Sequence, residues 1–384
     1  MTLRIGITSF AASGGSGILA TELGRHLAMR GHQVHFISSA LPLRLSGFEP
    51  NLCFHRVEMT TYTPFPSAPY SLALASKMTE VALSADLDLL HVHYAIPHAA
   101  SAYLAKQMLA PRPLKTITTL HGTDITLVGR EPSFFPLTRF AIEQSDAVTA
   151  VSQWLHDETV REFGTTREIR VIPNFVDTDV FRPRPDLRAA NPLRRGDEKL
   201  IIHASNFRPV KNVHRVAEIF AMVRQDLKCR LVLVGDGPEL ATIERLTKRL
   251  GVHDDVLFLG VQEEMEEVMA MADVLILPSE HESFGLVALE AISCGVPVVV
   301  SNRGGLPEVI TEGESGFLRD PHDVPAFAAA VTRILSEPEL AARMGETGRS
   351  ISRERFCIRC VITDYLDLYS ELLGRPLEAE AGGG

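Results

Sequence analysis

Two glutamates, Glu282 and Glu290, enclose a segment that could bind an anionic ligand rich in hydroxyl groups. The segment follows the apolar run 273–279 and leads into a helical pattern that ends at Gly295. A strand, a polar turn and a helix start leave free N–H groups at the carboxyl end of a sheet, where α/β proteins bind anions. Glu290 lies four residues after Leu286, about one helical turn below the helix start. Carboxylates beside N–H groups suit a nucleotide-sugar, although two solvated acids would give the same pattern.

Polar clusters also follow strand patterns in the first half of the chain. Gly14-Gly15-Ser16-Gly17 forms a glycine loop before a helix, where the backbone could approach a ligand closely, although a simple tight turn explains it equally well. Its spacing is neither that of a dinucleotide fingerprint nor that of a P-loop. Residues 91–94 and 121–124 each end an apolar strand. We expect His91 and His93 to point to opposite faces of their strand, which argues against a shared metal ion.

A lysine stands in the turn that follows the first strand of the second half. Lys211 lies in the segment 206–212, where an ammonium group is a natural partner for phosphate. Arg208 is either a second partner or a solvated side chain. The chain has no G-x-S-x-G elbow, and Glu290 is badly placed to share a scissile bond with Glu282. Hydrolysis by a serine triad or by paired carboxylates is therefore not indicated.

Short apolar runs alternate with helical patterns, which is typical of parallel βα units. We expect strands at 3–8, 33–38, 87–93, 115–120, 147–151 and 170–172, and, after a connector at 173–197, at 200–204, 230–234, 256–259, 274–277 and 296–301. The sequence therefore predicts an α/β fold with two Rossmann-like domains, 1–173 and 174–354, whose parallel sheets face a central cleft. A final helix at about 355–374 and a disordered tail at 375–384 complete the prediction.

The composition narrows the function further. The 384 residues suffice for two domains, and a net charge of −10 argues against a nucleic-acid partner. Glycine comes too early for a signal peptide, and no apolar run approaches the ~20 residues of a membrane span, so a cytoplasmic protein without a stable membrane anchor is expected. The five cysteines imply no disulfide framework. Cys357 and Cys360 form a single C-x-x-C, which we interpret as incidental because zinc would need two more ligands.

The stretch 282–290, with Ser283-Phe284-Gly285 inside it, resembles the signature of the retaining glycosyltransferases of family 4, which have the GT-B fold. The likeness covers about residues 3–374. Its other motifs stand where that family expects them: Gly14-Gly15-Ser16-Gly17, His121, Lys211 and Gly304-Gly305-x-Pro307-Glu308. Strings at 91–99, 118–126 and 205–208 look closer to a subgroup of the bacillithiol pathway. That subgroup moves N-acetylglucosamine from UDP-N-acetylglucosamine to the hydroxyl of L-malate.

The resemblance implies roles for the residues that would bind the donor. Lys211 and the backbone at Gly15 would bind the diphosphate, and Glu290 would hold the ribose hydroxyls. Glu282 and nearby N–H groups would hold the transferred sugar. Asn206 stands where many members carry an arginine, which leaves Lys211 as the main fixed cation. The donor candidates are Gly15, Asn206, Arg208, Lys211, Glu282, Ser283, Phe284, Gly285, Leu286 and Glu290.

The resemblance also implies how the acceptor and the reacting centre are arranged. His121 would contact the sugar near its reacting face, so the catalytic set is Lys211, Glu282 and His121. The acceptor candidates are Ser16, Tyr94, Thr123 and Arg139. The guanidinium of Arg139 suits a dicarboxylate, although a solvated helix arginine would look the same. No cofactor and no metal are implied, and the last helix is expected to cross back to the first domain.

Three alternatives remain open from the sequence. Another family 4 transferase could use the same site with a lipid or polysaccharide acceptor. A UDP-N-acetylglucosamine 2-epimerase would bind the same donor without a malate pocket. A non-catalytic sugar-nucleotide binding protein is disfavoured because Lys211, Glu282 and Glu290 are all present. The oligomeric state, including a homo-oligomer, is also left open.

Overall fold

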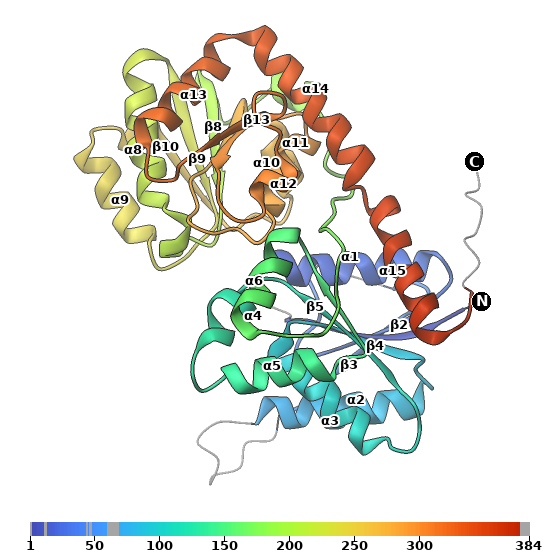
Figure 1. Ribbon diagram of the computed structural model, residues 1–384. Coiled ribbons are helices and arrows are strands. Elements are labelled where there is room, and N and C mark those ends of the chain that lie inside the picture. The colour runs from blue at the N-terminus through green and yellow to red at the C-terminus, as the bar shows by residue number, and fades with distance from the viewer. Residues whose placement is uncertain (1, 11–13, 44, 46–47, 60–68, 377–384) are drawn as a thin grey trace. The chain divides into compact units, whose positions relative to one another are not determined.

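The computed structural model describes residues 2–376 except 11–13, 44, 46–47 and 60–68. Most of the predicted tail therefore lies outside the described residues. The chain folds as two compact units (Figure 1): one comprises Met1–Asn174 together with Ile358–Gly384, and the other comprises Phe175–Cys357. Each unit has its own parallel sheet and its own apolar core.

The first unit is built on a seven-stranded sheet in the order β3-β2-β1-β4-β5-β6-β7, in which every neighbouring pair is parallel. Helices lie on both faces of this sheet (Figure 1). The strands are β1 (Arg4–Thr8), β2 (Gln33–Ser38), β3 (Leu52–Arg56), β4 (Leu89–His93), β5 (Lys115–Leu120), β6 (Ala147–Ala150) and β7 (Ile169–Val171). The strand order reverses between β1 and β4, which is where doubly wound sheets place their ligands.

The helix α6 of the first unit begins at a side-chain cap and ends at a glycine. Ser152 caps α6, because its Oγ accepts a hydrogen bond from the N–H of Leu155 at 3.0 Å, and Gly164 ends that helix with a φ of 54°. The helical segments are α1 (Gly15–Met29), α2 (Tyr70–Ser84), η1 (Ala95–Ala99), α3 (Ala100–Met108), α4 (Thr123–Thr126), η2 (Val128–Arg130), α5 (Phe135–Gln144), α6 (Gln153–Phe163) and α15 (Ile358–Leu373).

The last helix, α15, belongs to the first unit although it follows the whole second unit in sequence. It packs against α1, and the hydroxyl of Tyr369 lies 2.7 Å from Nδ1 of His91 on β4. Both side chains are fully buried. Val176 lies at the start of the second unit and Phe356 lies at its end. The N–H of Val176 donates to the carbonyl of Phe356 at 2.9 Å, so the segment that enters the second unit is hydrogen-bonded to the segment that leaves it.

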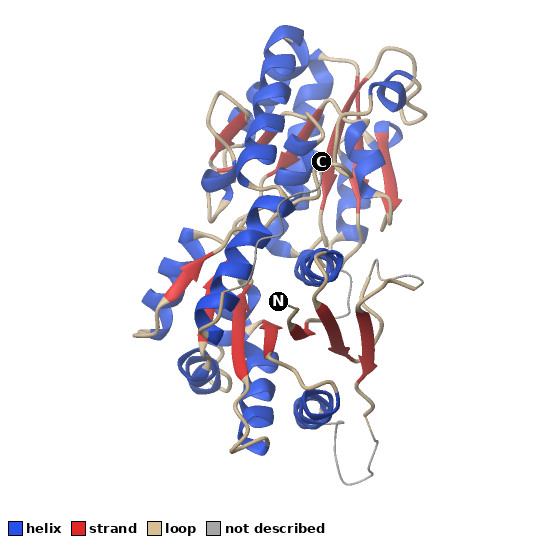
Figure 2. Ribbon diagram, turned by 90° about the vertical axis from the view of Figure 1, so that its right-hand side faces the viewer, coloured by secondary structure: helices blue, strands red, loops and turns tan. Residues whose placement is uncertain are grey.

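The second unit repeats the arrangement with six parallel strands in the order β10-β9-β8-β11-β12-β13. Figure 2 shows helices on both sides of these strands. The strands are β8 (Lys199–Ala204), β9 (Cys229–Val234), β10 (Val256–Gly260), β11 (Val274–Leu277), β12 (Val298–Ser301) and β13 (Gly316–Arg319). Its order reverses between β8 and β11. Most of the central strand residues are buried, as expected when both faces of a parallel sheet are covered.

Helices and short turns fill the connections of the second unit. They are α7 (Pro185–Ala189), η3 (Pro209–Lys211), α8 (Val213–Asp226), α9 (Leu240–Arg249), η4 (His253–Asp255), α10 (Met265–Ala270), α11 (Leu286–Ser293), α12 (Leu306–Val309), α13 (Val324–Ser336) and α14 (Pro338–Arg355). The helix α7 lies inside the predicted connector. No described helix is long and apolar enough to cross a membrane.

Candidate active site

The turns that follow β8 and β11 are joined by hydrogen bonds at the reversal point of the second sheet. The N–H of Glu280 donates to the carbonyl of Val210 at 2.8 Å, and the side-chain amide of Asn212 donates to the carbonyl of Pro278 at 3.0 Å. Asn212 has a φ of 51°, a left-handed conformation that asparagine tolerates better than most residues. These bonds fix η3, and with it the start of the Lys211 side chain.

Lys211 and Glu282 form an ion pair in this part of the molecule. Nζ of Lys211 lies 2.6 Å from Oε1 of Glu282, and the two side chains are 19% and 14% exposed. The hydroxyl of Ser279, which is fully buried, donates to the same oxygen at 2.9 Å. The structure therefore brings together two predicted catalytic residues and adds Ser279, which the sequence analysis did not select.

A glycine turn after β12 supports Glu282 from the other side. The N–H of Gly305 donates to the carbonyl of Glu282 at 2.8 Å. Gly304 has a φ of 67°, and a Cβ atom there would lie 2.0 Å from that same carbonyl oxygen. Only glycine fits this position without moving the Glu282 backbone.

The start of α11 presents the remaining donor candidates. Gly285 precedes the helix with a φ of 96°, and a Cβ atom there would lie 2.4 Å from the side chain of Leu306. The first turn of any helix leaves N–H groups without intrahelical partners, and here Leu286 is the first helical residue. Ser283 is partly exposed, Phe284 is buried, and Glu290 is 8% exposed on the helix.

Asn206 and Arg208 are exposed in the turn after β8. Next to them, Nδ1 of His203 donates to the carbonyl of Ile276 at 2.9 Å, so its Nε2 accepts from the hydroxyl of Ser205 at 2.8 Å. Burial lowers the pKa of His203 to about 4. This imidazole is neutral at pH 7, so the positive charge of the turn comes from Arg208 and Lys211.

In the first unit, a buried carboxylate joins the turns that follow β4 and β5. Asp124 accepts hydrogen bonds from the N–H groups of Ala95 at 2.9 Å, Gly122 at 2.9 Å and His121 at 3.2 Å. Burial is the largest influence on the pKa of Asp124 and raises it, while the backbone donors act in the opposite direction. Asp124 was not predicted as a site residue. Its position in the first turn of α4, three residues after the selected His121, is the signal that could have found it.

His121 lies beside two further histidines from β4. Its Nε2 is 2.8 Å from Nδ1 of His93, and the ring of His93 stacks on that of His91 with a centroid distance of 4.7 Å. The expectation that His91 and His93 point to opposite faces is wrong, because residues two apart on a strand share a face. Burial lowers the pKa of His121 and of His91 to about 3, and lowers that of His93 well below its usual value. These imidazoles are neutral at pH 7.

Two acceptor candidates are in direct contact with each other. The hydroxyls of Ser16 and Tyr94 lie 2.6 Å apart, and the rings of Tyr94 and His121 have centroids 5.1 Å apart. The glycine loop is shorter than expected, because Gly15 is already the first residue of α1. Gly15 and Ser16 therefore contribute N–H groups of a helix start rather than of a loop.

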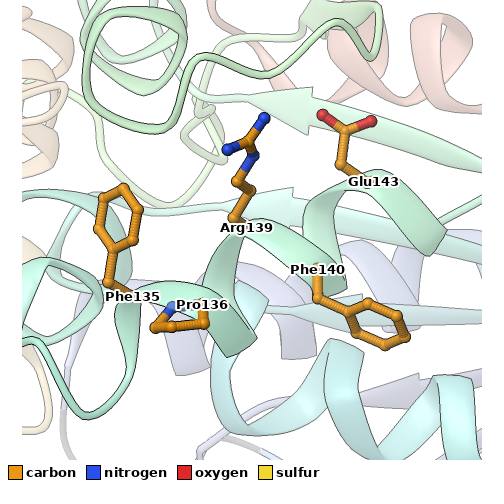
Figure 3. Close-up of a pocket in the computed structure, with 5 residues that line it drawn as sticks. All are labelled: Phe135, Pro136, Arg139, Phe140 and Glu143. Atoms are coloured by element: carbon orange, nitrogen blue, oxygen red, sulfur yellow. The ribbon is translucent and has the colours of Figure 1, made fainter.

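The other two acceptor candidates lie on separate helices. Thr123 is exposed at the start of α4, and Arg139 is exposed on α5. Arg139 lines a shallow pocket of about 420 Å³, and Arg139 and Glu143 extend to the same side of α5 (Figure 3). The pocket is lined by Phe135, Pro136, Arg139, Phe140 and Glu143. The helix α5 packs on η1, the segment that begins at the residue after Tyr94. No described contact, however, joins Arg139 itself to Ser16 or Tyr94.

Metal-binding side chains do not gather in the described residues: no group of three or more His, Cys, Asp or Glu could hold an ion there. Cys357 is buried directly before α15, and Cys360 is exposed in the first turn of that helix. Neither cysteine is among the site residues described above for the first unit or for the second unit.

Two family models match almost adjacent halves of this chain. Glycosyltransferase Family 4 matches residues 13–180, and Glycosyl transferases group 1 matches residues 186–351. Sucrose-phosphate synthase from Thermosynechococcus elongatus has the same fold, with a TM-score of 0.81 at 24% identity over 97% of this chain and 99% of that one. Anabaena Alr3699/HepE in complex with UDP and glucose matches with a TM-score of 0.79 at 20% identity, over 96% and 99%. The chain is a glycosyltransferase with the GT-B fold and belongs to glycosyltransferase family 4.

Related sequences narrow the comparison further. N-acetyl-alpha-D-glucosaminyl L-malate synthase from Bacillus anthracis is 48% identical over 375 residues, which cover 97% of this chain and 98% of that protein. A GDP-mannose-dependent alpha-(1-6)-phosphatidylinositol monomannoside mannosyltransferase from Mycolicibacterium smegmatis is 33% identical over 292 residues, or 72% and 74% of the two chains. The predicted family and the predicted resemblance to the malate-using subgroup are confirmed.

Proposed function

We propose that this protein transfers N-acetylglucosamine from UDP-N-acetylglucosamine to the hydroxyl of L-malate, with retention of the α configuration. This is the first step of bacillithiol biosynthesis, and we place it in the cytoplasm. The observation that carries the proposal is the 48% identity, over nearly the whole of both chains, to the malate synthase of Bacillus anthracis.

The donor would bind to the second unit. Lys211 would bind the diphosphate, assisted by the backbone at Gly15. Glu290 would hold the ribose, and Glu282 would hold hydroxyls of the transferred sugar. In support, Lys211 and Glu282 are 2.6 Å apart at the reversal point of the sheet, and Glu290 is on the helix that starts there. The remaining donor residues would be Asn206, Arg208, Ser283, Phe284, Gly285 and Leu286.

The acceptor would bind to the first unit. The hydroxyls of Ser16 and Tyr94, which already share a hydrogen bond, would contact L-malate together with Thr123. Arg139 would pair with a malate carboxylate, because a guanidinium presents two parallel N–H donors to a carboxylate. His121 would contact the sugar near its reacting carbon as a neutral imidazole.

Catalysis would rest on charge stabilisation and positioning. Lys211 and the N–H groups of helix starts would stabilise the departing diphosphate, and a phosphate oxygen would take the proton of the malate hydroxyl on the same face of the sugar. Apart from Gly15, the proposed donor residues belong to the second unit, whereas the proposed acceptor residues belong to the first.

The first test is product formation from UDP-N-acetylglucosamine with and without L-malate, in EDTA, followed by mass spectrometry. We expect UDP release that depends on malate and yields the malate glycoside. Succinate is the matched control, since it keeps both carboxylates but has no hydroxyl to accept the sugar. It should inhibit the reaction without being glycosylated.

Other results would identify the alternatives. Conversion of the donor without malate, with appearance of the 2-epimer, would indicate an epimerase. Donor binding without turnover on malate would indicate another acceptor and would require an acceptor screen. Turnover that stops in EDTA and returns with a divalent metal would contradict the metal-independent mechanism.

A further inference from the structure

The ion pair between Lys211 and Glu282 has a consequence for the order in which ligands bind and leave. The proposed function gives these two side chains to different parts of one donor: the diphosphate and the sugar. In the structure they are bound to each other, with Nζ and Oε1 only 2.6 Å apart and both side chains mostly buried. A diphosphate at Lys211 therefore brings negative charge next to the carboxylate of Glu282.

Apart from Lys211, the turn after β8 carries one other cation, the exposed Arg208, so little buried positive charge is available to relieve this conflict. Asn206 occupies the place where a second cation would be useful, and the nearby imidazole of His203 is held neutral by burial. The side chain of Asn212 is occupied by Glu280 at 2.6 Å. Two anionic groups would have to share the ammonium of Lys211, and like charges in a partly desolvated site repel each other strongly.

Glu282 is held in place independently of Lys211. The buried hydroxyl of Ser279 donates to Oε1 at 2.9 Å, and the N–H of Gly305 holds the backbone carbonyl at 2.8 Å. Lys211, in contrast, has a flexible four-carbon stem that begins in a fixed turn. Lys211 is therefore the partner that moves, while Glu282 stays.

We propose that Lys211 exchanges partners during turnover, and that this exchange makes the site prefer the sugar nucleotide to free UDP. With the whole donor bound, Lys211 pairs with the diphosphate, and sugar hydroxyls replace it as hydrogen-bond donors to Glu282. After transfer the sugar leaves with the acceptor, and Glu282 is left facing the diphosphate of UDP. Glu282 then draws Lys211 back and promotes the release of UDP. Ser279 acts as a positioning residue that keeps the carboxylate oriented throughout. This inference rests on the proposed function.

The test compares UDP with UDP-N-acetylglucosamine by isothermal titration calorimetry on the full chain. In Glu282→Gln the repulsion and the competition for Lys211 are both removed. We expect UDP to bind about two- to fivefold more tightly than to the wild type, the range of one partly exposed ion pair. The sugar nucleotide should bind more weakly, because an amide accepts fewer hydrogen bonds from hydroxyls. Product inhibition by UDP should increase accordingly.

Two further variants separate this exchange from a general loss of structure. Ser279→Ala should weaken binding of the sugar nucleotide but leave UDP affinity within about twofold, since the carboxylate charge remains. Glu337→Gln removes one carboxylate from a surface pair with Arg333 in the same unit and should change neither affinity. If Glu282→Gln unfolds, as judged by its melting temperature, Glu282→Ala provides the same comparison for UDP.

An unchanged or weaker affinity of Glu282→Gln for UDP would overturn the inference, provided that the wild type binds UDP. A failure of the proposed function would give a different result. The wild type would then bind neither UDP nor the sugar nucleotide, or would form no malate glycoside.

Discussion

Four histidines, His121 and three around it, are held as neutral imidazoles inside the first unit. Burial lowers the pKa of His91 and His121 to about 3 and that of His98 to about 4, and it lowers the pKa of His93 still further from its usual value. Nε2 of His93 and Nε2 of His98 have no hydrogen-bond partner among the described residues. A neutral imidazole suits the sugar contact proposed for His121, and it leaves the proposed stabilisation of the leaving group to Lys211.

This cluster predicts a loss of stability in weak acid. In the unfolded chain these imidazoles bind protons below about pH 6.5, whereas in the folded chain they do so only near pH 4 and below. The free energy of unfolding should therefore be flat above pH 6.5 and should fall as the pH drops from 6.5 toward 4. Each imidazole contributes up to about 1.4 kcal/mol per pH unit. Burial raises the pKa of Asp124, so protonation of this carboxyl stabilises the folded chain as the pH falls. This effect of one carboxyl is smaller than the opposite effect of the four imidazoles.

Urea unfolding at pH 7.5, 6.5 and 5.5 checks this prediction. His98→Phe, which keeps a ring beside Phe10, should reduce the slope below pH 6.5. An unfolding free energy that stays constant from pH 7.5 to 5.5 would show that the cluster is protonated, or open to water, in the folded protein.

Asp124 should be important for stability because one carboxylate holds two turns together. In Asp124→Asn the amide group would face the N–H of Ala95 or those of His121 and Gly122, so at least one buried donor would lose its acceptor. We expect a loss of about 1–3 kcal/mol in the free energy of unfolding, measured in urea, and a higher KM for L-malate. Asp157→Asn, on the exposed surface of α6, is the control and should stay within about 0.5 kcal/mol of the wild type. Equal stabilities for both variants would contradict this role.

At the level of secondary-structure elements, the two units use the same device: residues that follow different strands are joined at the reversal point of the sheet. The turn after β8 bonds to the turn after β11 through Val210 and Glu280. The turn after β5 bonds to that after β4 through Asp124 and Ala95. The site is therefore as rigid as the sheets that carry these turns.

A substitution at Gly304 tests how closely the turn after β12 must approach the turn that carries Glu282. In Gly304→Ala the new Cβ atom meets the carbonyl of Glu282, so Glu282, the residue proposed to hold the sugar, must shift. Gly313→Ala is a matched control, because Gly313 has a similar φ of 77° but nothing within 4 Å of a Cβ atom. Both variants should lose about 1–2 kcal/mol from the left-handed conformation. Only Gly304→Ala should also weaken binding of UDP-N-acetylglucosamine in calorimetry, and equal binding by both variants would contradict the argument.

The central strands of both sheets could be predicted because they are buried on both faces and therefore form apolar runs. The strands β3 and β13 were missed, since they carry polar side chains that are exposed, as at Arg56, or partly exposed, as at Arg319. The helix α7 was missed because five residues are too few for a periodic pattern.

The candidate site was predictable to the extent that it lies in turns after strands. Lys211, Glu282 and His121 could be selected from their positions after apolar runs, and their roles remain predictions. Ser279 and Asp124 could not be selected in this way, because their importance comes from hydrogen bonds between different segments. Local sequence does not record which turns become neighbours.

At the scale of the whole molecule, the returning helix α15 completes the first unit. Its Tyr369 provides the hydrogen bond to Nδ1 of His91, and Nε2 of the same ring lies 2.7 Å from Oγ1 of Thr119. Burial raises the pKa of Tyr369 well above its usual value, so this hydroxyl stays protonated. A fully buried ring nitrogen thus depends on a residue 278 positions away in the sequence.

Tyr369→Phe should destabilise the first unit. The ring still fills its place, but Nδ1 of His91 loses its partner in a fully buried environment, at a cost of about 1–3 kcal/mol. Thermal or urea unfolding of the full chain measures the loss. Tyr103→Phe, on α3 where the ring packs on Phe140, should have a smaller effect. A Tyr369→Phe protein as stable as the wild type would show that His91 finds another partner.

The position of α15 also bears on the order in which the chain acquires its structure during synthesis. The second unit is continuous in sequence and can fold as soon as residue 357 has left the ribosome. The first unit begins earlier but needs Ile358–Leu373 before α1 and His91 are covered. The half of the enzyme that is made first is therefore finished last, and a nascent chain that stops after the second unit exposes an apolar and histidine-bearing surface to chaperones.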